Sequence, residues 1–274
     1  MFEGILNNVR EKTPLVHCIT NYVTVNDVAN VLLACGGSPI MADDEEDALE
    51  ITSICNALVL NIGTLNRRTI ASMLKTGKRA NELSHPVVLD PVGAGASSLR
   101  TETTFKLLKE VKFSVIRGNI SEIKTVAKGK GTTRGVDADV SDVVTDRNLV
   151  ETISFAKKLS AGTGSIIAIT GPIDLVAEAH KAYVIRNGHP MMSKITGTGC
   201  MLTALIAAYY AANPERPLEA TAAAVCAMGL SGELAYNRLV QTDGGTSSYR
   251  TYLIDAISKL DAQTLEGGLR IEIR

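Results

Sequence analysis

Apolar runs of strand length recur along the first 170 residues, and segments with a helical spacing of apolar positions lie between them. The predicted strands are Leu15–Thr20, Ala57–Gly63, Pro86–Val92, Phe113–Asn119 and Ser165–Thr170. The predicted helices are Asp43–Ile54, Arg68–Leu83, Glu102–Val111 and Asp146–Ser160. Strands that are apolar throughout and alternate with helices are typical of a parallel sheet buried on both faces. The pattern therefore predicts an α/β fold with a central, mostly parallel β-sheet covered by helices on both faces.

The last hundred residues follow a different pattern. Asp174–Glu178 and Lys181–Asn187 predict two strands joined by a short turn, and we expect Pro190–Ile195 to extend them. Two Ala-rich segments are apolar on most faces, as buried helices are: Cys200–Ala212 and Pro217–Val240. Since no linker, repeat or low-complexity segment interrupts the chain, we predict a single domain over residues 1–274.

Composition and charge exclude several classes of protein. The 274 residues are 45% hydrophobic and 21% charged, with a formal net charge of −1. Proteins that bind nucleic acid or a membrane surface usually carry a basic patch, so we expect neither partner. The densest basic stretch, Lys124–Arg134, is interleaved with Gly and Thr and is interpreted as a solvated loop. The longest apolar run, Met201–Ala212, is too short to span a bilayer.

The cysteines indicate the compartment. They are odd in number and lack Cys-x-x-Cys or zinc-like spacing: Cys18, Cys35, Cys55, Cys200 and Cys226. This pattern predicts reduced thiols. The segment Met1–Lys12 mixes charges with short apolar pieces and lacks the apolar core of a signal peptide. We therefore expect a soluble, cytoplasmic protein.

The strongest local signal is the segment Ile195-Thr-Gly-Thr-Gly-Cys200, which directly precedes a predicted helix. Gly197 and Gly199 allow the backbone to curl so that successive N–H groups point at one spot, and the helix N-terminus adds a positive dipole there. Such a loop is suited to bind a phosphoryl group. The alternative is an ordinary strand-to-helix turn with Thr198 as the helix cap.

Cys200 ends this loop, where a side chain would face the bound anion. Most free cysteines are small buried apolar residues, and Cys226 inside an apolar helix fits that interpretation. A helix N-terminus, however, lowers the pKa of a thiol and makes it reactive. We therefore predict that Cys200 has a chemical role.

Two further strand ends carry polar groups. Asp90 follows a buried strand and precedes a flexible loop, so its carboxylate is placed to hold Mg²⁺ or water. The segment Arg117-Gly-Asn-Ile-Ser-Glu122 supplies a cation, an amide and a carboxylate within six residues. Either segment alone could merely cap a helix or stabilise a loop. Because ligands of open α/β sheets bind beyond the carboxyl ends of the strands, their convergence predicts one site at that edge.

Several common site motifs are absent from the sequence. There is no Gly-x-x-x-x-Gly-Lys-Ser/Thr, no complete Gly-x-Gly-x-x-Gly and no Gly-x-Ser-x-Gly. These absences argue against a P-loop enzyme, a standard dinucleotide fold and a hydrolase nucleophile elbow. The four histidines are scattered without metal-like partners: His17, His85, His180 and His189.

Taken together, six segments resemble the hydroxyethylthiazole kinase family of the ribokinase-like superfamily. They are Pro14-Leu-Val-His-Cys-Ile-Thr-Asn21, Ser38-Pro-Ile-Met-Ala42, Leu58-Val-Leu-Asn-Ile-Gly-Thr64, Asp90-Pro-Val-Gly-Ala-Gly-Ala96, Arg117-Gly-Asn119 and Thr196-Gly-Thr-Gly-Cys200. The resemblance runs from about Pro14 to the C-terminal helix. It implies a ribokinase-like fold and ATP-dependent phosphorylation of the hydroxyl group of 4-methyl-5-(2-hydroxyethyl)thiazole, a reaction of thiamine salvage.

The resemblance also implies partners and residue roles. The enzyme would use ATP as co-substrate and Mg²⁺ as cofactor, and would form a homotrimer with active sites between subunits. The thiazole pocket would be lined by Asn21, Val23, Met41 and Gly197. The ATP phosphates would contact Arg117, Asn119 and Thr170. Mg²⁺ and its waters would be organised by Asp90 and Glu122. The catalytic loop would comprise Gly197, Gly199 and Cys200, with Cys200 at the position where most of the superfamily has an Asp as base.

The sequence departs from the family pattern at one place, and it leaves several alternative functions open. The family often reads Gly-Pro-Gly-Ser-Phe before the last helix, whereas this chain has Gly245-Thr-Ser-Ser-Tyr249. One alternative within the superfamily is a kinase for a pyrimidine or pyridoxal alcohol. From other classes, the alternatives are an ATP-dependent hydrate dehydratase, which has Asp where Cys200 stands, and a catalytically silent binding protein. Our mechanistic hypothesis is in-line transfer with Cys200 as a modest base, in preference to a covalent nucleophile.

Overall fold

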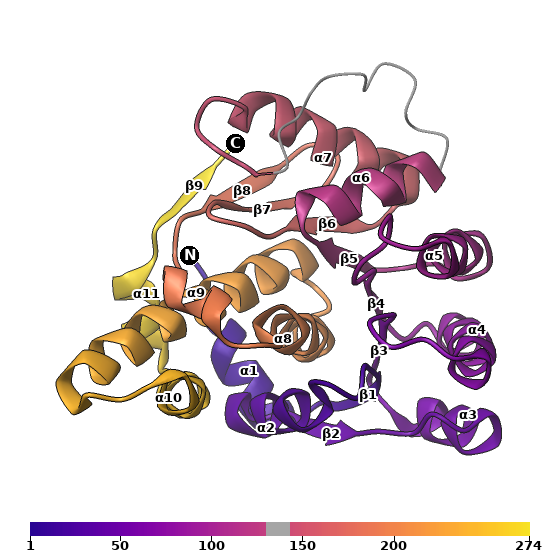
Figure 1. Cartoon of the computed structure of the whole chain (residues 1–274), viewed down its shortest axis with the longest axis horizontal. Coiled ribbons are helices and arrows are strands. Elements are labelled where there is room, and N and C mark those ends of the chain that lie inside the picture. Colours follow the sequence, from indigo (N-terminus) through magenta and orange to yellow (C-terminus); the bar gives the residue numbers. More distant parts are fainter. Residues whose placement is uncertain (130–142) are drawn as a thin grey trace.

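The computed structural model describes residues 1–129 and 143–274, and its nine strands form one sheet with the order β2-β1-β3-β4-β5-β6-β7-β8-β9 (Figure 1). The strands are β1 (Leu15–Ile19), β2 (Ser38–Ile40), β3 (Ala57–Asn61), β4 (Val87–Asp90), β5 (Val115–Gly118), β6 (Ile166–Ile169), β7 (Asp174–Ala177), β8 (Ala182–Ile185) and β9 (Ile271–Ile273). The six strands β1 to β6 are parallel to one another, whereas β7, β8 and β9 pair antiparallel with their neighbours. The predicted mostly parallel sheet is confirmed.

Helices cover both faces of this sheet (Figure 1). On one side of the sheet lie α1 (Ile5–Lys12), α2 (Val25–Cys35), α8 (Thr198–Ala212) and α9 (Pro217–Thr242), with α10 (Thr246–Lys259) and α11 (Ala262–Gly268) packed on α9. The other face is covered by α3 (Glu45–Ile54), α4 (Arg67–Glu82), α5 (Ser98–Glu110), α6 (Ile120–Gly129) and α7 (Leu149–Thr163). Two separate hydrophobic cores result, one on each side of the sheet.

The period-2 geometry of the strands sends alternate residues into these two cores. Val59 of β3 and Val88 of β4 belong to the core on the α8 side, whereas Leu60 and Leu89 belong to the other core. Asn61 and Asp90 end the same two strands and are aligned as partners in the parallel ladder. By this alternation, two polar side chains at the carboxyl edge of the sheet share the face of α8.

The prediction that Pro190–Ile195 extends the antiparallel strands is wrong. Residues Pro190–Lys194 form a 3₁₀ helix, η1. Its first turn is stabilised because the backbone N–H of Met191 donates to Nδ1 of His189 at 3.1 Å, and a proline is favoured at a helix start. The outer partner of β8 is instead β9, which comes from the C-terminus of the chain.

The solvated-loop interpretation of Lys124–Arg134 is wrong for its first part. Residues up to Gly129 continue α6, and the rest of that stretch lies outside the described residues. None of the described helices has the length and apolar character needed to cross a membrane. All five cysteines are free, as predicted. The single-domain organisation stays a prediction.

Candidate active site

Two cavities meet at the N-terminus of α8, beyond the carboxyl ends of the parallel strands. The larger has a volume of about 610 Å³ and the smaller about 340 Å³. Arg117, Asn119 and Gly199 line both of them. The site therefore lies at the sheet edge where the sequence predicted it.

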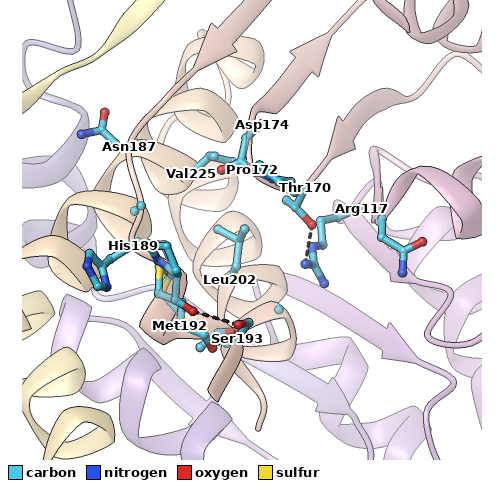
Figure 2. A pocket seen from close by; sticks show the side chains of 18 residues that line it. Arg117, Thr170, Pro172, Asp174, Asn187, His189, Met192, Ser193, Leu202 and Val225 are labelled. Carbon is cyan, nitrogen blue, oxygen red and sulfur yellow. Dashed lines mark hydrogen bonds between the residues drawn. The ribbon is translucent and has the colours of Figure 1, made fainter. Parts of the chain in front are cut away.

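The larger cavity combines a polar end with an apolar interior (Figure 2). Its polar end contains the three residues predicted to contact ATP phosphates: Arg117, Asn119 and Thr170. Its apolar walls come from Pro172, Met192, Leu202, Val225 and Met228. Figure 2 shows Asn187 and His189 at the opposite side of the cavity, so its apolar walls lie between two polar regions. Such a cavity suits a nucleotide, whose base is flat and largely apolar and whose phosphates are charged.

The smaller cavity brings together most of the other predicted residues. It is lined by Asn21, Val23, Asp90, Glu122, Gly197 and Cys200, together with Thr24, Gly63 and Thr64. Met41, which we predicted in the thiazole pocket, does not line either of these cavities. It lies just after β2 and packs on the core of the α8 side. The structure thus places the predicted thiazole residues at one junction, with Met41 apart.

Arg117 connects the two cavities electrostatically. Its Nη2 donates to Oγ1 of Thr170 at 2.6 Å, and its Nη1 lies 3.5 Å from Oδ2 of Asp90. The side chain is only 12% exposed, and its buried Nε has no partner among the described residues. A guanidinium held in this way places a permanent positive charge where phosphate oxygens would enter.

Two positions at the start of α8, Gly197 before the helix and Gly199 in its first turn, require glycine for steric reasons. Gly197 is the N-cap residue of α8, has a φ of 90°, and a Cβ there would lie 2.8 Å from Cγ2 of Thr24. A Cβ on Gly199 would lie 2.4 Å from Nη1 of Arg117. Glycine therefore permits the left-handed turn at the first position and the close approach of the guanidinium at the second. Thr198 is not the helix cap, since α8 has no side-chain cap hydrogen bond.

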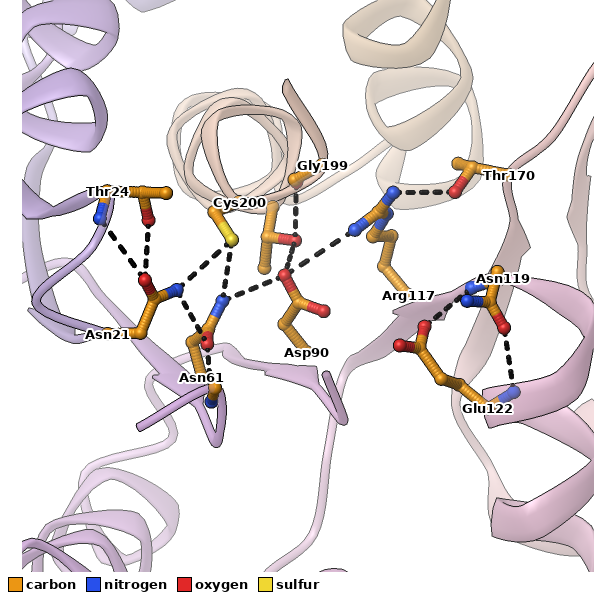
Figure 3. Close-up of polar contacts among 12 residues, drawn as sticks. Asn21, Thr24, Asn61, Asp90, Arg117, Asn119, Glu122, Thr170, Gly199 and Cys200 are labelled. Atoms are coloured by element: carbon orange, nitrogen blue, oxygen red, sulfur yellow. Dashed lines mark hydrogen bonds and ion pairs between the residues drawn. The ribbon is translucent and has the colours of Figure 1, made fainter. Parts of the chain in front are cut away.

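Asp90 is fully buried and carries its charge inside a hydrogen-bond network (Figure 3). Its Oδ2 accepts hydrogen bonds from Oγ1 of Thr203 at 2.8 Å and from Nδ2 of Asn61 at 3.0 Å. Its Oδ1 is buried and has no hydrogen-bond partner among the described residues. Burial raises the pKa of Asp90 to about 6, the Glu122 charge adds to that effect, and the Arg117 charge opposes it.

The carboxylates of Asp90 and Glu122 fit a divalent cation. Glu122 receives the backbone N–H of Gly93 on Oε1 and that of Asn119 on Oε2, both at 2.8 Å, which fixes its position between two loops. Within residues 1–129 and 143–274, no group of three or more His, Cys, Asp or Glu is placed to hold a metal. Mg²⁺ is usually held by one or two carboxylates together with water and phosphates. The unpartnered oxygen of Asp90 is therefore a suitable Mg²⁺ donor.

Cys200 lies between two side-chain amides. Its Sγ accepts from Nδ2 of Asn21 at 3.2 Å and from Nδ2 of Asn61 at 3.3 Å (Figure 3). Burial and the nearby Asp90 charge raise the pKa of the Cys200 thiol, although these amide hydrogen bonds oppose the rise. The expectation of a lowered pKa for this thiol is wrong, because burial and the nearby Asp90 charge disfavour the thiolate.

Thr24 and Thr203 escaped the sequence analysis, and Asn61 entered it only as part of a strand end, within the segment Leu58–Thr64. Asn61 had a usable signal, because it ends a buried strand just as Asp90 does. Thr203 follows Cys200 by three residues, a spacing that places two side chains on one face of a helix. Thr24 had no comparable signal, since its role depends on Asn21, whose Oδ1 accepts its hydroxyl at 3.0 Å.

Comparison with known proteins relates the chain to one family. The hydroxyethylthiazole kinase family profile matches residues 6–263. A hydroxyethylthiazole kinase from Clostridium acetobutylicum is 64% identical over 272 residues, covering 99% of each chain. The solved structure of hydroxyethylthiazole kinase from Pyrococcus horikoshii OT3 superposes with a TM-score of 0.87 at 33% identity, covering 98% of this chain and 97% of that one. A ribokinase-like superfamily protein from Enterococcus faecalis V583 shares the fold, with a TM-score of 0.62 at 13% identity over 93% and 88% of the two chains.

We predict that Gly199→Ala weakens ATP binding by at least about tenfold, because the added methyl group would displace the Arg117 guanidinium from the junction. Isothermal titration calorimetry with ATP measures the effect. Gly245→Ala is the matched control, since a Cβ at Gly245 meets nothing within 4 Å. Equal ATP affinity of Gly199→Ala and the wild type would contradict the role assigned to Arg117.

We predict that Asp90→Asn stabilises the protein at pH 7. The folded pKa of about 6 lies above the ordinary value of 3.8, so ionisation of Asp90 costs folding free energy above about pH 6 and this cost disappears as the pH falls to about 4. The variant should gain roughly 1 to 3 kcal/mol at pH 7 and nothing at pH 4. Denaturant unfolding at both pH values measures the gain.

The control for this measurement is Asp261→Asn. Asp261 is an exposed cap of α11, and hydrogen bonding to Thr264 lowers its pKa. Because the ionised form is favoured there, this variant should show no gain at pH 7. A loss of stability in Asp90→Asn at pH 7 would show that the carboxylate charge stabilises the fold.

Proposed function

The chain belongs to the hydroxyethylthiazole kinase family, and we propose that it transfers the γ-phosphoryl group of ATP to the hydroxyl group of 4-methyl-5-(2-hydroxyethyl)thiazole. The observation that carries this proposal is the junction of the two cavities at the N-terminus of α8, where Arg117 and Gly199 line both. A phosphoryl donor in one cavity and an alcohol in the other would meet at that junction. The full-length identity of 64% to a hydroxyethylthiazole kinase supports this choice of substrate.

We assign ATP to the larger cavity. Its apolar walls suit the adenine ring, and its polar end leads toward Arg117 and Thr170. We assign the thiazole alcohol to the smaller cavity, with Asn21 and Val23 at its wall and Gly197 near the hydroxyl group. Proximity and orientation of the two reactants account for much of the acceleration in such a reaction.

The first residues of α8 and Arg117 would stabilise the transferred group. During transfer, the bond from the γ-phosphorus to the ADP oxygen breaks, a bond to the alcohol oxygen forms, and negative charge collects on the phosphoryl oxygens. The backbone N–H groups at a helix N-terminus and a guanidinium are both suited to that charge. Gly199 is required between them because it lets the guanidinium approach the helix.

Cys200 is the group placed to take the proton of the alcohol. Burial and the Asp90 charge raise the pKa of its thiol, so only a small fraction is ionised at neutral pH. A loose phosphoryl-transfer transition state needs proton removal only late, so a weak base is sufficient. We therefore assign Cys200 a modest proton-transfer role, with positioning and electrostatics supplying most of the rate enhancement.

Mg²⁺ would be held by Asp90 and Glu122, partly through water. When bound, the ion would neutralise charge on the ATP phosphates. The support from this chain is Oδ1 of Asp90, which has no hydrogen-bond partner in the described part of the chain, and the carboxylate of Glu122, which two backbone N–H groups hold in place. The raised pKa of Asp90, about 6, further predicts that its metal affinity falls as the pH drops below that value.

We further propose a homotrimer with active sites between subunits, located in the cytoplasm. Tyr22 and Val23 are 78% and 57% exposed, although Val23 lines the smaller cavity. A neighbouring subunit would cover these apolar side chains and complete the thiazole pocket. Met41, which does not line the cavities of a single chain, would reach such a shared pocket from another subunit. The reduced cysteines support the cytoplasmic location.

The substrate is tested by measuring ADP release with ATP, Mg²⁺ and hydroxyethylthiazole, beside hydroxymethylpyrimidine and pyridoxal. We expect turnover with the thiazole alcohol and at least about a hundredfold lower kcat/KM with the others, because a mismatched pocket leaves polar groups unpaired. Turnover with another alcohol only would transfer the protein to a sister kinase. Dehydration of a nicotinamide-cofactor hydrate would indicate a lyase, and ATP binding without any turnover would indicate a silent binding protein.

We predict that sedimentation velocity gives a mass close to three times 29.1 kDa at micromolar concentration. Val23→Glu should shift this equilibrium toward the monomer, since a charge would be buried at the interface. Val150→Glu is the control, because Val150 is also exposed, at 79%, but lies on α7, away from both cavities. A monomeric wild type, or equal effects of the two variants, would contradict the interfacial site.

A further inference from the structure

Asn61 is a buried amide that uses both ends of its side chain in the active site. Its Oδ1 accepts the backbone N–H of Gly63 at 2.9 Å and Nδ2 of Asn21 at 3.1 Å. Its Nδ2 donates to Oδ2 of Asp90 at 3.0 Å and to Sγ of Cys200 at 3.3 Å. It is 2% exposed and does not line either cavity, so it acts on the site only through these neighbours.

The neighbours fix the orientation of this amide. A backbone N–H such as that of Gly63 can only donate, so it requires the oxygen of Asn61 on its side. A carboxylate such as Asp90 accepts when ionised, so it requires the NH₂ group on the other side. A flipped amide would place its oxygen against the Asp90 carboxylate and lose all these bonds. The strand register makes this arrangement possible, because Asn61 and Asp90 are ladder partners on the α8 face.

The fixed amide determines what the Cys200 sulfur can do. Sγ accepts N–H groups from both Asn21 and Asn61, so the hydrogen of a neutral thiol must point away from both amides. Hydrogen bonds donated to sulfur also stabilise the thiolate. They act against the two influences that disfavour it, burial and the negative charge of Asp90. Asn61 therefore donates hydrogen bonds both to the Asp90 carboxylate, whose charge disfavours the thiolate, and to the Cys200 sulfur.

We propose that Asn61 is a positioning residue that orients the Cys200 sulfur for proton transfer. This inference deepens the proposed function and rests on it for the identity of the reaction. The effect of Asn61 on the sulfur, in contrast, is a property of the protein alone. It can be measured without any substrate.

The decisive measurement is the pH dependence of iodoacetamide alkylation of Cys200 in the full-length protein, read by mass spectrometry of the Cys200 peptide. Cys200 is partly exposed whereas the other four cysteines are buried, and Cys200→Ala gives the background. Asn61→Ala removes the donor, and the isosteric Asn61→Asp also adds a negative charge while keeping the size of the side chain. We expect alkylation at pH 8 to slow about tenfold in Asn61→Ala and further in Asn61→Asp.

A merely structural role predicts the opposite result. If Asn61 only stabilises the packing around the end of β3, its loss would loosen the pocket, expose the Cys200 thiol and speed its alkylation. The matched control is Asn81→Ala, which removes a side-chain amide that bonds both backbone groups of Lys112 at 2.7 and 2.8 Å, at the end of α4. Alkylation in this control should equal that of the wild type. Faster or unchanged alkylation in both Asn61 variants would overturn the proposal.

Steady-state kinetics then tests the connection to turnover. We expect Asn61→Ala to lower kcat at least about tenfold while KM for ATP stays within about threefold, because Asn61 does not line the nucleotide cavity. In a Cys200→Ala background the same substitution should cost less than about threefold, since the partner sulfur is already gone. Equal losses in both backgrounds would overturn the coupling to Cys200. If none of the alcohols is turned over but alkylation still slows from the wild type to Asn61→Ala to Asn61→Asp, the proposed substrate is wrong and the effect of Asn61 on Cys200 stands.

Discussion

The buried charge of Asp90 is the constraint on which the rest of the site depends. A carboxylate at the end of β4 is unfavourable unless it is paired and hydrogen-bonded. Arg117 supplies the opposite charge, Thr203 and Asn61 supply donors, and one oxygen has no partner within residues 1–129 and 143–274. This free oxygen would suit the Mg²⁺ ion that we propose for the site. Burial raises the pKa of the group to about 6, so the ionised carboxylate costs folding stability at neutral pH.

The same charge explains the environment of Cys200. Its thiol lies at a helix N-terminus, which by itself favours the thiolate, yet the pKa is raised because the thiol is largely buried and close to Asp90. Two amides, from Asn21 and Asn61, offset part of this effect. The mechanism that we propose accordingly relies on positioning the reactants and on neutralising phosphate charge, with Cys200 as a weak base. The close approach of Arg117 to Gly199 serves that purpose directly.

Much of the candidate site could be predicted from the sequence because its residues end predictable elements. Asp90 and Arg117 lie at the ends of continuously apolar strands, and Cys200 follows a glycine-rich turn before a helix. Asn61 ends a strand of the same kind, but its importance depends on register and on which side of the sheet α8 packs. Thr203 lies inside an apolar helix, where its three-residue spacing from Cys200 indicates a shared helix face but not its contact with Asp90. The failed extension at Pro190–Ile195 has a similar origin, since the strand that pairs with β8 comes from residues 271–273.

The sequence by itself determined the class of fold, the edge of the sheet that carries the chemistry, and the family. These properties follow from periodicity, from strand ends and from short motifs, all of which are local in the chain. Only the tertiary structure decided the pKa of Asp90, the raised pKa of Cys200 and the orientation of Asn61. The physical reason is that burial, charge proximity and hydrogen-bond geometry depend on residues that are far apart in the chain. Cys200 and Asn21 are separated by 179 positions, yet Sγ of the first lies 3.2 Å from Nδ2 of the second.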